Sequence, residues 1–90
     1  MQFQWDDLND HEGNLYHILS SHPEMRSSRF IELVFDTPSG DEDIYDSIRG
    51  KETYLVVEKT YRRKLYKIVF QKVGIAIRIK TGHRINRRRS

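Results

Sequence analysis

"LYKIVFQKVGIAIRIK", residues 65–80, holds two segments in which apolar side chains recur at every second position. In the first segment Tyr66, Ile68 and Phe70 alternate with Lys67 and Gln71, and in the second segment isoleucines occupy positions 75, 77 and 79. A period of two is typical of a β-strand with one face on a core and the other in solvent. The short "VG" step between the segments has the length of a hairpin turn, so we expect the two strands to pair antiparallel.

The residues before this stretch extend the predicted sheet. "TYLVVEK", residues 53–59, is apolar on both faces, as expected of a central strand, and "TYRRK", residues 60–64, has the length of a hairpin connection. The acidic stretch at 39–52 allows at most a short edge strand around Ile44–Ile48. These segments together predict an antiparallel sheet of three to four strands.

A first helix is predicted in "HEGNLYHILSS", residues 11–21, with Asn9 or Asp10 as its cap. Three apolar residues have the i, i+3, i+4 spacing of an amphipathic helix: Leu15, Ile18 and Leu19.

A second helix is expected to begin at Ser21 or His22, because the proline that follows suits a first helical turn. Its apolar face would come from residues 30–35, and Pro38 would end it. Two helices followed by a run of strands predict an α+β fold, with two N-terminal helices packed on one face of the sheet.

Length and composition narrow the class of protein. Ninety residues correspond to one domain, 1–90, and the absence of cysteine excludes disulfides and thiolate metal sites. No apolar run approaches the ~20 residues of a membrane span, and the opening "MQFQWDDLND" lacks the apolar region of a signal peptide. We therefore expect a cytoplasmic protein with no membrane contact.

Charge is divided unevenly along the chain. Residues 1–58 hold all thirteen acidic and four basic residues, a net charge of −9, whereas residues 59–90 hold twelve basic residues and no acid, a net charge of +12. Such a split favours contact with nucleic acid or another polyanion. The alternative interpretation is that the two halves neutralise each other in the fold.

Five segments in order carry a family resemblance: "FQWDD", "EGNLYHI", "VFDTP", "ETYLVVEKTYRRKLYKIVF" and "IRIKTGHRINRRR". This order and spacing resembles the BrnT-type toxins, small ribonucleases of bacterial toxin–antitoxin pairs with a RelE-like fold. The resemblance implies a metal-independent endoribonuclease that cleaves RNA, including mRNA at the ribosome, and so inhibits translation. It also implies a hetero-oligomer with a ribbon-helix-helix antitoxin that neutralises the toxin.

The match to the family is uneven along the chain. The opening motifs are matched by Trp5, Asp6, Asn14, His17 and Ile18. The later motifs are matched by Glu52, Arg78, Arg87 and Arg88, whereas Lys64 and His83 stand where the family has arginines.

Cleavage of a phosphodiester needs a base, an acid and cations near the phosphate. His83 is the candidate base or acid, because the reference pKa of histidine is about 6.5 and surrounding cations favour the neutral ring. Arg78 would hold a phosphate through two N–H groups, and Glu52 is a second candidate base. The alternative interpretations are a loop position for His83, a solvated sheet face for Arg78 and a surface acid for Glu52.

Cations interleaved with an aromatic side chain in "TYRRK" and "RINRRRS" predict contact with single-stranded RNA. The candidate RNA-binding residues are Arg62, Arg63, Lys64, Lys80, Arg84, Arg87 and Arg88. The acids at 41–43 are interpreted as a shield for this basic surface, as a contact for a cationic antitoxin, or as a solubilising loop. No metal or other cofactor is expected, since His11 and His17 are six residues apart on a predicted helix, not the four that helical zinc ligands prefer.

A second function from a different class stays open. The chain would then be a catalytically silent RelE-like binding module that acts through a protein partner or through electrostatic contact with nucleic acid. The lysine at 64 and the histidine at 83, where the family has arginines, favour this alternative.

Overall fold

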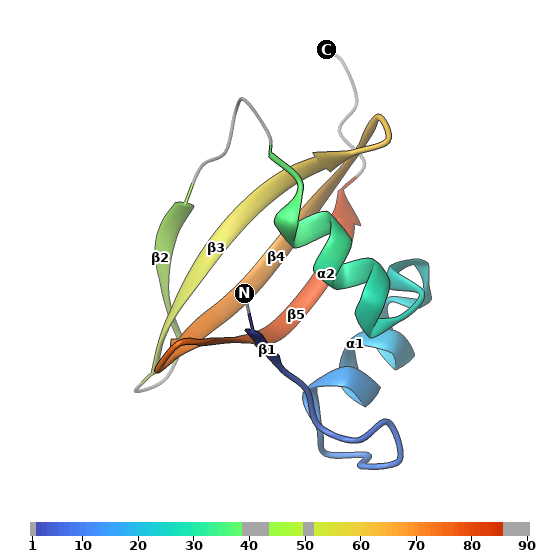
Figure 1. Ribbon diagram of the computed structural model, residues 1–90, viewed down its shortest axis with the longest axis vertical. Coiled ribbons are helices and arrows are strands. Elements are labelled where there is room, and N and C mark those ends of the chain that lie inside the picture. The colour runs from blue at the N-terminus through green and yellow to red at the C-terminus, as the bar shows by residue number, and fades with distance from the viewer. Residues whose placement is uncertain (1, 39–43, 50–51, 86–90) are drawn as a thin grey trace.

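The computed structural model describes residues 2–38, 44–49 and 52–85. Its elements in chain order are β1 (Gln2–Gln4), α1 (Asn14–Ser21), the 3₁₀ helix η1 (Pro23–Met25), α2 (Ser28–Asp36), β2 (Ile44–Arg49), β3 (Glu52–Tyr61), β4 (Lys64–Val73) and β5 (Ala76–Ile85). The helices lie on one side of a curved sheet (Figure 1). The predicted α+β class is therefore confirmed.

The sheet has five strands in the order β1-β5-β4-β3-β2. The strands β2 to β5 pair antiparallel, as expected, and the edge strand at 44–49 is present. The prediction of a wholly antiparallel sheet of three to four strands is wrong in one respect, because β1 pairs in parallel with β5, Phe3 opposite Ile77. A strand of three residues is too short to show a periodic pattern, and its partner lies at the other end of the chain.

The helices begin later than predicted. Helix α1 starts at Asn14 after Gly13, and neither Asn9 nor Asp10 caps it. Instead, Asp10 Oδ1 accepts a hydrogen bond from the Glu12 amide at 3.0 Å within a turn. The Asp10 carboxylate is thus used within the loop before α1 and does not cap the helix.

Proline 23 begins only the short helix η1, so the predicted start of the second helix at Ser21 or His22 is wrong. Helix α2 begins at Ser28 because Ser27 provides the cap: its Oγ accepts a hydrogen bond from the Phe30 amide at 3.1 Å.

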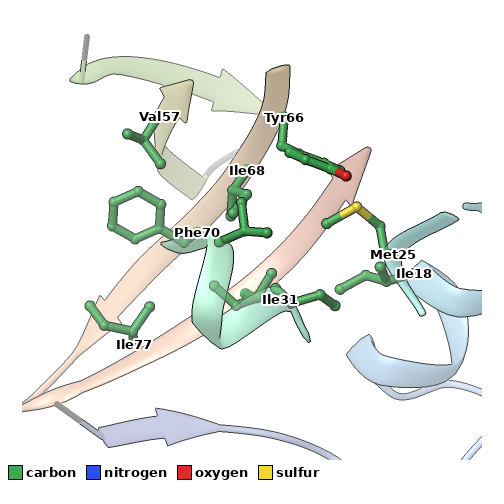
Figure 2. Close-up of a cluster of buried hydrophobic side chains, with 10 residues drawn as sticks. Ile18, Met25, Ile31, Val57, Tyr66, Ile68, Phe70 and Ile77 are labelled. Carbon is green, nitrogen blue, oxygen red and sulfur yellow. The ribbon is translucent and has the colours of Figure 1, made fainter. Parts of the chain in front are cut away.

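The core lies between the helices and one face of the sheet (Figure 2). Ile18, Met25 and Ile31 come from the helical side, and each is 0–1% exposed. They meet Ile68 and Phe70 of β4, which confirms the face of β4 that alternation predicted. On the other face of β4, Val69 packs with Tyr54 and Val56 in a second, smaller cluster. Lys67 and Gln71 of that face belong to the site described next.

Candidate functional site

A β-bulge in β5 places His83 and Arg78 on the same face of the sheet. Arg78 pairs with Gln71 and His83 pairs with Lys67, whereas Lys80 has no partner in the register. Cross-strand partners share a face, and positions 67 and 71 of β4 point away from the core. In a regular strand without a bulge, positions 78 and 83 would lie on opposite faces, because they are five residues apart and the strand period is two.

His83 lies within the strand. The alternative interpretation of His83 as a loop residue is wrong, because β5 continues to Ile85. Gly82, beside it, allows this continuation: a Cβ at Gly82 would lie 3.1 Å from Met25 Cε. The strand can therefore pass close over the core and carry the imidazole outward.

Two imidazole rings meet at this edge of β5. The ring centroids of His22 and His83 are 5.1 Å apart, with a tilt of 30° between the rings. Glu24 Oε2 lies 3.7 Å from His22 Nδ1, so the carboxylate pairs with this ring when the ring is protonated. His22 follows α1, where its amide donates to the Ile18 carbonyl at 2.7 Å.

The surroundings of His83 favour its neutral form. Burial lowers the pKa of His83, and the nearby charges of His22 and Lys67 lower that pKa further, against the opposing effect of Glu24. A neutral imidazole can accept a proton, so the ring is suited to act as a general base near neutral pH.

Arg78 is engaged by a carboxylate from the start of the chain. Its guanidinium donates to Asp6 through Nη2 to Oδ2 at 2.7 Å and through Nη1 to Oδ1 at 3.3 Å. The hydrogen bonds from Arg78, and then the one from the Asn14 amide, hold the pKa of Asp6 below its usual value. The predicted phosphate clamp is therefore already paired with an anion.

Asn14 holds the Asp6 loop against β5. Its Oδ1 accepts from the amides of Asp6 and Leu15 at 2.9 Å, and its Nδ2 donates to the carbonyls of Gln4 at 3.1 Å and Ile79 at 2.9 Å. Every donor and acceptor of this buried amide is satisfied, which stabilises the joint between β1, α1 and β5.

Gly13 makes room for this joint. A Cβ at Gly13 would lie 2.5 Å from Asp6 Cβ, so a larger residue at that position would push the Asp6 loop away from α1.

A pocket of about 420 Å³, here called the α1–β5 pocket, is lined by residues of α1 and its flanks and by residues of β3, β4 and β5. Its polar lining includes Glu12, His17, His22, Arg78, Lys80 and Thr81. Lys80 Nζ lies 6.0 Å from the centroid of the Tyr54 ring, within cation–π range. Because His22 lines this pocket and also stacks near His83, the pocket and the histidine pair form one continuous site.

The remaining predicted residues separate into two groups. Arg62, Lys64 and Arg84 line a second pocket at the end of the β3–β4 hairpin, and Arg63 is exposed in the turn beside it. Glu52 begins β3, but its side chain lies outside the part of the chain that the structure describes, as do Arg87, Arg88 and the acids at 41–43.

Sequence analysis missed several members of the site: His22, Glu24, Lys67 and Tyr54. For Lys67, the alternation in β4 predicted only that the side chain faces away from the core. No local sequence pattern indicates that His22 contacts His83, because the two residues are far apart in the chain. Among residues 2–38, 44–49 and 52–85, no three His, Asp or Glu residues are grouped so that they could hold a metal ion.

Comparison with protein-family profiles, with curated proteins and with solved structures finds no match to this chain. The resemblance to BrnT-type toxins thus remains a prediction. In the described part of the chain, no helix has the length and apolar character needed to cross a membrane.

Proposed function

We propose that this chain is a metal-independent endoribonuclease, the toxin of a toxin–antitoxin pair with a RelE-like fold, neutralised by a ribbon-helix-helix antitoxin. The observation that carries the proposal is the His22–His83 pair on a cationic sheet face. Two imidazoles 5.1 Å apart offer a base and an acid together, and the pKa of one of them is lowered. Lys67 and Lys80 lie on the same face to stabilise charge that develops on a phosphate.

The proposed reaction is transfer of a phosphoryl group within the RNA chain. His83 removes the proton from a ribose 2′-hydroxyl, and the 2′-oxygen forms a bond to the adjacent phosphorus. The bond from phosphorus to the 5′-oxygen breaks, and His22 in its protonated form donates a proton to that leaving oxygen. The products are a 2′,3′-cyclic phosphate and a free 5′-hydroxyl.

The test uses purified protein and a single-stranded RNA, with products resolved by mass spectrometry. We expect cyclic-phosphate ends from the native protein, a loss of about 100-fold or more in rate for His83→Ala and for His22→Ala, and no cleavage of the same sequence as DNA. His11→Ala is the matched control, because His11 is exposed and stacks on Tyr16 away from the pair. Equal rates in all three variants would refute the assignment.

A silent binding module is the second candidate, and the Asp6–Arg78 pair favours it, because the cation expected to clamp a phosphate already has a carboxylate partner. In that case the native protein would bind RNA or a protein partner, and neither it nor any of the variants would generate cyclic-phosphate ends.

A further inference from the structure

The second pocket lies at the end of the β3–β4 hairpin and has a volume of about 460 Å³. It is here called the hairpin pocket. Four cationic side chains line it: Arg26, Arg62, Lys64 and Arg84. Glu24 is the one acid in its described lining. No carboxylate among the described residues forms an ion pair with any of the four. The described lining of the pocket therefore carries an excess of positive charge, unlike the position of Arg78.

Aromatic rings form the wall of the hairpin pocket. Phe30 meets Tyr61 and Tyr66 edge to face, with centroids 5.7 Å apart in both pairs. The guanidinium of Arg26 lies 5.2 Å from the centroid of Phe30, and that of Arg62 lies 5.5 Å from the centroid of Tyr61. Guanidinium planes layered on aromatic rings are the surface on which bases of single-stranded nucleic acids stack.

Three arginines at this pocket have positive φ values, which residues other than glycine rarely adopt: Arg26 and Arg62 in the lining, and Arg63 in the turn beside it. Arg26 has φ 68° and ψ −59°, and the Ser27 amide donates to the Met25 carbonyl at 2.7 Å across it, which makes a γ-turn. Arg62 and Arg63 have φ of 50° and 66° and form the two-residue turn of the hairpin. Such a turn favours asparagine and glycine. Strained backbone of this kind is concentrated at binding sites, where the surrounding structure holds it in place.

Glu24 joins the hairpin pocket to the histidine pair. Its Oε2 lies 3.7 Å from His22 Nδ1 and accepts a hydrogen bond from the Arg84 amide at 3.3 Å. Burial opposes its charge, but hydrogen bonds from backbone amides and the charges of His22 and Arg84 hold the pKa of Glu24 below its usual value. One carboxylate therefore links the two sites, and Arg84 directly follows His83 in the chain.

We propose that the hairpin pocket is a subsite for one nucleotide of single-stranded RNA that flanks the bond at the His22–His83 pair. The base stacks against the Arg26 and Arg62 layers, and the backbone phosphate is held by Lys64 and Arg84. The role of a flanking nucleotide rests on the proposed ribonuclease function. Nucleotide binding itself is independent of cleavage. A peptide with acidic side chains would use the cations but leave the aromatic wall without a role, which favours RNA as the occupant.

The test measures binding of a fluorescent single-stranded RNA hexamer by anisotropy, with the proteins in a His83→Ala background so that no cleavage occurs. We expect Arg26→Ala and Arg62→Ala each to weaken binding about tenfold, because stacking of a base is worth ~1–3 kcal/mol. Arg29→Ala is the matched control: it removes the same charge from an exposed position on α2 that pairs with Glu32. We expect the affinity of this variant to change less than twofold.

Two competitors separate stacking from charge alone. Inorganic polyphosphate and a polyglutamate peptide are added to the RNA complex. If the Arg26 and Arg62 variants bind RNA as tightly as the Arg29 variant, or if polyglutamate competes as well as unlabelled RNA, the assignment to a nucleotide is wrong. Equal loss of polyphosphate and RNA affinity in these variants would reduce the pocket to a phosphate contact and also overturn the stacking claim.

The outcomes distinguish this proposal from the ribonuclease proposal. Cleavage by the native protein, together with unchanged binding in the Arg26 and Arg62 variants, would remove the subsite and leave the ribonuclease. Tenfold weaker binding in these variants, together with no cleavage by the native protein, would establish nucleotide binding and remove the ribonuclease.

Discussion

At the scale of single residues, His83 depends on neighbours that come from three elements. Its cross-strand partner Lys67 belongs to β4, His22 directly follows α1, and Glu24 lies in η1. The charge of Lys67 disfavours a second positive charge on the imidazole, which is one cause of the lowered pKa of His83. Removing that charge should consequently raise the pKa of His83.

We predict that Lys67→Met raises the pKa of His83 by about 0.5 pH unit or less, since charge pairs near a surface are worth about 1 kcal/mol or less. The measurement is NMR titration of the imidazole Cε1–H signal. If the protein cleaves RNA, the acidic limb of the rate profile should move to higher pH by the same amount. Lys72→Met, an exposed position on the same strand, is the control. A lower pKa for His83 in the Lys67 variant would contradict the prediction.

Several residues of the site were predictable, and their partners were not. Alternation placed Tyr66, Ile68 and Phe70 on the core face, and the structure confirms this. The ion pair between Asp6 and Arg78 joins residues 72 positions apart, so neither local spacing nor charge runs could indicate it. Because of this distance in sequence, Arg78 was predicted to bind a phosphate, and its pairing with Asp6 was not predicted.

At the scale of elements, the β3–β4 hairpin combines regular strands with an unfavourable turn. Arg62 and Arg63 both occupy left-handed backbone conformations, for which asparagine and glycine are preferred. The hairpin was predictable from strand periodicity, but the pocket at its end was not, because it also needs Arg26 and Phe30 from the helical side.

We predict that replacing the turn pair Arg62-Arg63 by Asn-Gly stabilises the fold by about 0.5–1 kcal/mol, the usual effect of matching a residue to its backbone conformation. The same variant should lose RNA affinity, because it removes two cations and the layer over Tyr61. Thermal unfolding followed by circular dichroism measures the first effect, and anisotropy measures the second. A variant that is less stable than the native protein would show that the arginine turn is not strained.

At the scale of the whole molecule, the acidic residues 1–58 and the basic residues 59–90 contact each other at a few positions. Asp6 neutralises Arg78 at one end of β5, and Glu24 contacts the Arg84 amide near the other end. The interpretation that the two halves cancel thus applies to the position of Arg78, whereas the hairpin end keeps its four cations. The overall charge split was readable from the sequence, but its pairing depended on the fold.

We predict that RNA binding weakens with salt as expected for four phosphate contacts. The contacts are Lys64 and Arg84 of the hairpin pocket, with Lys67 and Lys80 beside the histidine pair. The plot of log K against log salt should have a slope of about −3, because each contact on a single strand contributes ~0.7. Lys64→Ala should reduce the steepness by about 0.7, and Arg29→Ala should leave it unchanged. A slope near zero for the native protein would exclude electrostatic RNA binding.

The unpaired Lys80 also bears on how the gene for this chain can change in length. Loss of that one codon would remove the bulge and leave Ile79 opposite Phe70 and Thr81 opposite Val69. The imidazole would stay opposite Lys67, because every remaining pair keeps its partner and cross-strand partners share a face. In descendants of this chain, we therefore expect deletion of this single codon to be tolerated, with the facing of the strand's outer half preserved.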